Sequence, residues 1–170
     1  MFKIETERLI IREYAFEDDI FILKLLNDPS FIENIVDKNV RTIEAARNYL
    51  STGPMASYEK NGFGLWCVVL KEGNIAIGMC GLIKRDVLDD IDIGYAFLPE
   101  YCSKGYAIES VAAVKKYANT NLGIKRVVAV VNPENARSIK LLEKMNFVYE
   151  KMVRLAPEEK EIKLFASIEK

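Results

Sequence analysis

The sequence predicts an α/β domain built on a mixed β-sheet. Runs of β-branched residues alternate with segments whose apolar residues recur at helical spacing, in the order β-α-α-β-β-β-α-β-α-β-β. Residues 90–98 and 125–131 are expected to be the two strands of a β-α-β unit. Such a unit makes its strands parallel and places the amino end of its helix beside the carboxyl end of the first strand. Because no linker or repeat divides residues 1–170, we expect one domain.

The first sixty residues are predicted to form one strand and two helices. The run RLIIREY at 8–14 is typical of a strand, since β-branched residues lie between charges. A helix is expected after the acids at 17–19, ending near Asn27-Asp28-Pro29. A second helix should begin after Thr42, a typical N-cap, and Gly53-Pro54 should interrupt it.

The rest of the chain is predicted to alternate strands with two further helices. Strands at 63–70 and 75–83 flank a hairpin turn at 71–74, where Gly73 supplies a positive φ. One helix should run from Lys104 to about Asn119, because apolar residues recur there at helical spacing. The remaining elements are a helix at 137–145 and two closing strands at 147–155 and 161–168.

Composition excludes several functional classes. A formal net charge of −1 argues against electrostatic binding to nucleic acid or to an anionic membrane surface. The chain has no His, which excludes His-based triads and His-containing zinc sites, and no metal site is predicted. Its apolar runs are much shorter than the ~20 residues of a membrane span, and the charged start at 1–7 is unlike a signal peptide. Three Cys without CxxC spacing indicate free thiols in a reducing, cytoplasmic setting.

The loop 101–107 is the segment most suggestive of a binding site. Small residues at 103, 105 and 107 let a ligand approach the backbone closely, and a helix is expected to begin there. Unpaired N–H groups at a helix start form an anion site suited to a pyrophosphate, and Lys104 adds a positive charge. The alternative is an ordinary strand-to-helix turn in which Gly105 only relieves crowding. Neither a P-loop nor a complete Rossmann fingerprint occurs in the chain.

The same loop resembles a known cofactor-binding motif. Residues 101–110 (YCSKGYAIES) are similar to the acetyl-CoA signature Gln/Arg-x-x-Gly-x-Gly/Ala of the GCN5-related N-acetyltransferase (GNAT) superfamily. Gly105 and Ala107 match its last two fixed positions. Cys102 departs from the usual Gln or Arg, and Ser103 stands where related sequences carry Gly.

Three other motifs extend the resemblance over about 90% of the chain, in the order that the family has them. The opening TERLIIR at 6–12 followed by two acids, and Asp92-Ile93-Gly94-Tyr95, resemble the ribosomal-protein-alanine acetyltransferase branch, whose strand reads Glu-Ile-Gly-Tyr. The segment 135–147 resembles its Asn-x-x-Ser helix, which ends in Gly-Phe. Here Asn146 replaces that Gly, and Asn also tolerates the left-handed conformation.

The resemblance implies a GNAT-type fold: a mixed, mostly antiparallel sheet with a central splayed parallel strand pair and flanking helices. The gap between strands 90–98 and 125–131 would expose backbone groups that pair with the pantetheine amides of acetyl-CoA. Asn135 would contact the pantetheine arm, unless it acts only as a helix N-cap, and Arg137 or Lys140 would reach the adenosine phosphate. The implied backbone contacts are Tyr95, Ala96 and Phe97 for pantetheine, and Ser103, Lys104, Gly105, Tyr106 and Ala107 for the pyrophosphate.

The expected reaction is direct attack of a primary amine on the thioester in a ternary complex. Asp92 aligns with the branch's strand Glu and is the candidate base, acting through water; alternatively it is a solvent-exposed sheet carboxylate. The N–H of Tyr95 or Ala96 would stabilise the oxyanion. Ser138 is the candidate donor of the final proton, because Leu142 occupies the position of the family's usual Tyr acid. Alternatively, Ser138 bonds a backbone carbonyl one helical turn earlier.

The acceptor stays open at this stage. The branch resemblance suggests a protein N-terminal Ala or Ser, and a polyamine, amino sugar or amino acid is equally compatible with the sequence. The altered loop and the missing Tyr acid motivate an alternative, a non-catalytic acyl-CoA-binding module. Cys102 is expected to be a bystander thiol and Glu109 a brace for the loop. The oligomeric state stays open at this stage, with a homodimer as one alternative because relatives are often dimers.

Overall fold

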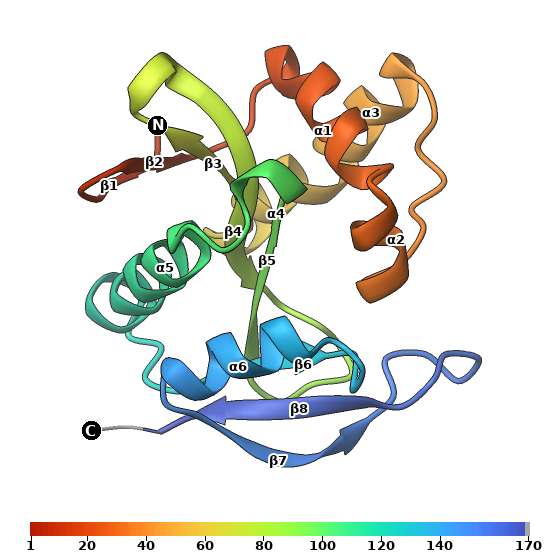
Figure 1. Cartoon of the computed structure of the whole chain (residues 1–170), viewed down its shortest axis with the longest axis vertical. Coiled ribbons are helices and arrows are strands. Elements are labelled where there is room, and N and C mark those ends of the chain that lie inside the picture. Colours follow the sequence, from red (N-terminus) through yellow and green to blue (C-terminus); the bar gives the residue numbers. More distant parts are fainter. Residues whose placement is uncertain (169–170) are drawn as a thin grey trace.

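An eight-stranded sheet forms the centre of the computed structural model, which describes residues 1–168 (Figure 1); the last two residues of the predicted domain lie outside this range. The strand order is β1-β2-β3-β4-β5-β6-β8-β7. All described neighbours pair antiparallel except β5 and β6, which run parallel, so the mostly antiparallel mixed sheet is confirmed. The strands are β1 (Lys3–Glu5), β2 (Leu9–Arg12), β3 (Leu65–Leu70), β4 (Ile75–Ile83), β5 (Ile91–Phe97), β6 (Val127–Val131), β7 (Phe147–Val153) and β8 (Ile162–Ser167).

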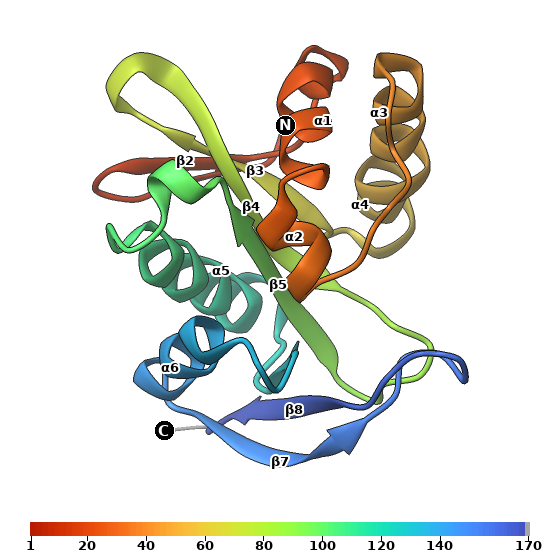
Figure 2. The same cartoon turned by 45° about the vertical axis from the view of Figure 1, so that its right-hand side comes forward.

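Helices cover both faces of the sheet. Figures 1 and 2 show α5 (Tyr106–Leu122) and α6 (Ala136–Lys144) side by side against one face. The other face is covered by the N-terminal helices α1 (Asp19–Leu26), α2 (Pro29–Asn34) and α3 (Ile43–Leu50), and α3 continues into α4 (Ala56–Asn61). Each layer buries an apolar stripe against the sheet, which is the main force that holds such a fold together.

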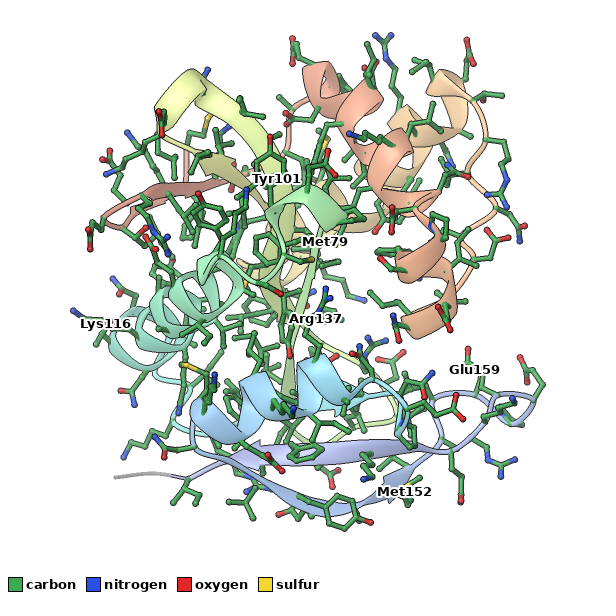
Figure 3. All side chains as sticks on the ribbon, in the orientation of Figure 1. Met79, Tyr101, Lys116, Arg137, Met152 and Glu159 are labelled. Carbon is green, nitrogen blue, oxygen red and sulfur yellow. The ribbon has the colours of Figure 1, made fainter. Side chains whose placement is uncertain are left out.

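The apolar core differs between the two faces. Under α5 and α6 it is one continuous cluster that includes Ile93, Phe97 and Val111. On the opposite face it is divided: one cluster lies beneath α1–α3 and includes Met79, which Figure 3 labels, and a smaller cluster around Val128 lies on β6 and β8. A polar position between the two clusters therefore lies at a break in the apolar layer.

Alternation along β5 assigns the candidate site residues to opposite faces. Ile93, Tyr95 and Phe97 belong to the core under α5 and α6, whereas Ala96 belongs to the core under α1–α3. Since side chains alternate along a strand, Asp92 shares the face of Ala96. The candidate base and the Tyr95 side chain are thus on different sides of the sheet.

The parallel pair β5–β6 is short and then opens. The two strands pair only at Ile91 with Val127 and at Asp92 with Val128, although both continue toward their carboxyl ends. Residues 93–97 of β5 therefore pair with β4 along one edge and have no β6 partner along the other, which faces the gap. The splayed parallel pair that the resemblance implied is present.

Three features of the N-terminal half differ from the sequence-based expectations. The predicted strand at 8–14 is shorter, and a three-residue edge strand, β1, precedes it. Asp28 and Pro29 do not simply end a helix, since the Asp28 side chain accepts the Ser30 N–H and caps the new helix α2. Gly53-Pro54 does not break the chain's helical path, because a wider π-helical turn at Ser51–Met55 joins α3 to α4.

Turn and cap residues follow the expectations closely. The Thr42 side chain accepts the Ala45 N–H and caps α3. Gly73 and Asn146 have φ values of 77° and 60°, so the two predicted left-handed positions are confirmed. The helix predicted from Lys104 begins two residues later, at Tyr106, because Gly105 has a φ of 84° and cannot belong to a right-handed helix.

Candidate functional site

The gap beside β5 presents backbone groups of alternating residues. The Leu98 N–H donates to the Ile77 C=O at 3.0 Å, and the antiparallel register continues from there without a shift. Because residues of an antiparallel strand alternate in the direction of their backbone groups, Ala96 points toward β4. Tyr95 and Phe97 point their N–H and C=O groups toward the gap. Of the two predicted oxyanion donors, this register favours Tyr95.

The loop before α5 contains two residues in the left-handed region. Ser103 has a φ of 60° and Gly105 a φ of 84°. The first intrahelical hydrogen bond of α5 runs from the Glu109 N–H to the Gly105 C=O, so the N–H groups of Tyr106 and Ala107 have no helical partner. Together with the positive end of the helix dipole they make this loop suited to an anion. Lys104 is exposed beside it.

A network from the β1–β2 turn holds this loop. One oxygen of Glu109 accepts from the Thr6 hydroxyl at 2.6 Å and from the Arg8 N–H at 2.9 Å, and the other accepts from Arg8 Nε at 2.7 Å. Arg8 Nη1 also donates to the Lys104 C=O at 3.0 Å, and its guanidinium lies 4.5 Å from the centre of the Tyr106 ring. Glu109 is therefore a brace, as expected, and its partners come from a segment about 100 residues away in the chain.

We expect Glu109→Gln to destabilise the protein by about 1–2 kcal/mol and to weaken acetyl-CoA binding, because a neutral amide accepts the Arg8 and Thr6 hydrogen bonds less strongly. Burial raises the pKa of Glu109, but hydrogen bonds from Thr6 and Arg8 outweigh it and the pKa is lowered. This carboxylate therefore stabilises the fold above its unfolded-state pKa, and the contribution is lost as pH falls through the lowered folded-state pKa. Urea unfolding from neutral to acid pH checks this; an identical pH dependence in wild type and variant would contradict it.

The amino end of α6 places two more predicted residues at the gap. Asn135 caps the helix, since its side-chain oxygen accepts the Ser138 N–H at 3.2 Å. Its NH₂ group makes no hydrogen bond within residues 1–168 and is available to a ligand. Arg137 is exposed and lies at the amino end of α6, beside β5 in Figure 3. Asn135 thus performs the capping role, and a contact to pantetheine stays a prediction.

Asp92 lies at the point where β5 and β6 part. It is 2% exposed, so the expected alternative of a solvent-exposed sheet carboxylate is wrong. Its Oδ2 accepts from Arg85 Nε at 2.7 Å, whereas its buried Oδ1 has no hydrogen-bond partner in the described chain. Burial raises the pKa of Asp92, and the Arg85 cation, its hydrogen bond and the Val130 N–H oppose that shift without cancelling it. An unsatisfied buried carboxylate oxygen with a raised pKa is suited to accept a proton.

Ser138 lies across the gap from Asp92, on the α5/α6 face. Its Oγ is 2.6 Å from Tyr95 Oη. Burial raises the pKa of Tyr95 to about 12, although the Ser138 hydrogen bond lowers it slightly. Ser138 lies in the first turn of α6, where the residue four positions earlier, Glu134, precedes the helix. The alternative of a bond to the carbonyl one turn earlier is therefore not what this structure has.

Comparison with known proteins gives the fold a family. A family model described as "Acetyltransferase (GNAT) domain" matches residues 8–148. This chain belongs to the GNAT acetyltransferase family. A curated relative named N-acetyltransferase YoaA, from Bacillus subtilis, is 31% identical over 152 residues, which are 89% of this chain and 85% of that one. Since the chain is a GNAT domain and its relatives are named N-acetyltransferases, it is an acetyl-CoA-dependent acetyltransferase.

Solved GNAT structures share the whole architecture. A GNAT-family acetyltransferase from Bacillus anthracis has a TM-score of 0.80 at 27% identity, and the match covers 97% of each chain. RimL, a ribosomal L7/L12 alpha-N-protein acetyltransferase solved in complex with coenzyme A, has a TM-score of 0.81 at 15% identity, covering 98% of each chain. The second likeness concerns the fold alone.

The residues of this GNAT domain fit acetyl-CoA as a substrate. Along the gap, the backbone groups of Tyr95 and Phe97 have no β6 partner, and the Phe97 C=O accepts only a long contact from Cys102 Sγ at 3.9 Å. The loop at 103–107 offers N–H groups at a helix start. An added Cβ at Gly105 would lie 3.1 Å from Arg8 Nη2, so a larger residue there would press on the arginine that holds the loop. No helix among the described residues is both long and apolar enough to cross a membrane.

Some residues of the GNAT site escaped the sequence analysis. Arg85 carries no local signal, because it lies in an irregular loop and meets Asp92 only in the folded chain. The sequence predicted a role for the Tyr95 backbone and none for its side chain, which contacts Ser138. Arg8 was noted within the TERLIIR motif, but its contact with Glu109 depends on the pairing of β1 and β2.

Proposed function

We propose that this GNAT enzyme transfers an acetyl group from acetyl-CoA directly to a primary amine in a ternary complex. The opening between β5 and β6, next to the loop at 103–107, carries the proposal. The pantetheine amides would pair with the backbone of Tyr95 and Phe97, with Ala96 between them. The pyrophosphate would occupy the N–H groups from Ser103 to Ala107. Asn135 would donate its free NH₂ to the pantetheine arm, and Arg137 would pair with the adenosine phosphate.

Asp92 is the base that we assign to the amine. An alkyl ammonium has a pKa near 8 to 10.4, so a base must take its proton before attack. The Asp92 Oδ1 is buried and unpaired on the face of α1–α3, opposite the helices that flank the donor site. Because the carboxylate is 2% exposed, a water molecule in the break between the two apolar clusters would relay the proton.

We assign partners on the gap side of β5 to the two negative charges that develop in the reaction, on the carbonyl oxygen and on the leaving sulfur. The Tyr95 N–H points toward the gap and would stabilise the oxyanion of the tetrahedral intermediate, a contribution of roughly 3 kcal/mol to the barrier. Ser138 would donate a hydrogen bond from its hydroxyl to the departing thiolate and so stabilise it until it is protonated. The amino end of α6 also favours negative charge there.

The acceptor that we favour is a protein N-terminal amine. The branch resemblance of the sequence supports this, and so does the fold shared with RimL, which is named as an alpha-N-protein acetyltransferase. Small amines are the competing acceptors. Thiol release from acetyl-CoA, measured with N-terminal Ala and Ser peptides, polyamines, amino sugars and amino acids, distinguishes them. Turnover with none of these amines would overturn the proposed reaction.

A second candidate is an acyl-CoA-binding module without turnover. The Arg85–Asp92 ion pair favours it, because Arg85 occupies one oxygen of the assigned base, and Leu142 takes the place of the family's Tyr acid. Calorimetry with acetyl-CoA, run beside the thiol-release assay, separates the two. Binding without release above background would support the module.

The cysteines bear on the compartment in which we place the protein. All three cysteines are free, and Cys67 and Cys80 are buried, which supports a reducing, cytoplasmic setting. A homodimer stays a prediction, which sedimentation of the purified protein tests.

A further inference from the structure

Ser138 has an unusual hydrogen-bond partner for a helical serine. The comparison within this chain is Ser110 in α5, whose Oγ donates to the Tyr106 C=O at 2.7 Å, as helical serines commonly do. Ser138 instead bonds the side chain of Tyr95, 43 residues earlier in the chain. Its backbone is also fixed, since the Ser138 N–H donates to Asn135 Oδ1. The serine is therefore held at two points beside the gap.

The direction of the Tyr95–Ser138 bond follows from the chemistry of the two hydroxyls. A phenol is a stronger acid than an aliphatic alcohol, so it is the better donor. Burial raises the pKa of Tyr95 to about 12, so the phenol keeps its proton at any working pH. Tyr95 Oη therefore donates, and Ser138 Oγ accepts. The proton of Ser138 is then left to point away from Tyr95.

We propose that Tyr95 is a positioning residue: its hydroxyl donates to Ser138 Oγ and thereby directs the Ser138 proton at the leaving thiolate. This rests on the proposed function above. The amine nitrogen first bonds to the acetyl carbon; when the tetrahedral intermediate collapses, the C–S bond breaks and its electron pair goes to sulfur. The sulfur accepts the Ser138 hydrogen bond, and the proton that completes the CoA thiol comes from solvent. Tyr95 keeps its own proton throughout.

The proposal is tested on bound CoA, without any acceptor. The absorbance of the thiolate near 240 nm, followed against pH in the CoA complex, gives the pKa of the bound thiol. We expect Tyr95→Phe and Ser138→Ala each to lower the acid dissociation constant of that thiol about tenfold. Ser138→Ala removes the hydrogen bond to the charged sulfur, and Tyr95→Phe removes the donor that directs the Ser138 hydroxyl at the sulfur. The double variant should match the single ones, because the two hydroxyls act as one unit.

Turnover gives a second readout. Tyr95→Phe should lower kcat about tenfold and leave the KM for acetyl-CoA unchanged, since the backbone of residue 95 and the packing of its ring are kept. Tyr117→Phe is the matched control, because it removes the same hydroxyl from the other half of α5, where Tyr117 packs on Phe2 and Trp66. This control should change neither the thiol pKa nor kcat.

The two measurements distinguish failure of the positioning role from failure of the proposed function. A bound thiol whose pKa is the same in wild type and Tyr95→Phe overturns the positioning role and leaves the proposed function standing. CoA that fails to bind the wild-type protein overturns both. If Tyr95→Phe does not fold, Ser138→Ala decides, because alanine is a good helix former and removes the same contact from α6.

Discussion

Asp92→Asn is expected to lower kcat by about 10²–10⁴-fold with little change in acetyl-CoA affinity. The amide keeps an oxygen that can accept the Arg85 Nε–H, so the local packing survives. What it loses is the ability to take a proton at the unpaired Oδ1. Because Asp92 lies on the face away from the donor helices, the donor site is left intact. Steady-state kinetics with the best acceptor measures the loss.

The pH dependence gives the same substitution a distinct signature. Burial raises the pKa of Asp92. As pH falls, the carboxylate is therefore protonated, and lost as a base, at a higher pH than an ordinary aspartate. The wild-type kcat should therefore have an acid limb above the usual aspartate range, and Asp92→Asn should lack it. For stability the sign is reversed: a raised folded-state pKa means that stability falls as pH rises from the unfolded-state to the folded-state pKa.

Asp90→Asn is the matched control. Asp90 lies two residues earlier and pairs with an arginine in a similar way, since Arg126 Nε donates to its Oδ2 at 3.0 Å, but its side chain is 35% exposed. The control should keep kcat and its acid limb. If Asp92→Asn behaved like Asp90→Asn, the base would lie elsewhere.

Gly105→Val should raise the dissociation constant for acetyl-CoA by about 10–100-fold, the effect of losing one or more hydrogen bonds to a charged phosphate. At a φ of 84° a branched side chain is strained, and its Cβ would lie 3.1 Å from Arg8 Nη2. The valine would thus push on the Arg8 brace and fill the surface beside the N–H groups of the loop. Isothermal titration with acetyl-CoA measures the change.

The other end of α5 supplies the control for backbone strain. Gly123 also has a positive φ, 68°, and an added Cβ there would meet nothing within 4 Å. Gly123→Val should therefore cost about 1–2 kcal/mol of stability, as Gly105→Val does through its backbone, without changing acetyl-CoA affinity. Equal affinities in the two variants would show that the loop at 103–107 does not bind the diphosphate.

Local chemistry explains which parts of the fold could be predicted. Thr42 caps a helix, and Gly73 and Asn146 adopt a positive φ. Each role depends on the residue's own chemistry, so it could be predicted from the sequence. The edge strand β1 is only three residues long and offers no periodicity. The expected interruption at Gly53-Pro54 was wrong because proline, which has no N–H to donate, fits into a wider π-helical turn.

The candidate site divides in the same way. The loop at 103–107 could be singled out from the sequence because small residues at a helix start leave backbone N–H groups open to a ligand. The depth of Asp92 and its Arg85 partner could not be predicted, since both depend on how β4, β5 and β6 pack. The Tyr95–Ser138 bond joins a strand to a helix that only the finished sheet brings together.

The gap along β5 has a consequence for how such a protein tolerates change. Its contacts to the donor's amides would come from the main chain, which every amino acid supplies alike. Substitutions of the Tyr95 side chain thus leave those main-chain contacts in place, whereas the Phe97 side chain is held in the core. Substitution of the Tyr95 side chain can therefore change the rate of the reaction without loss of donor binding.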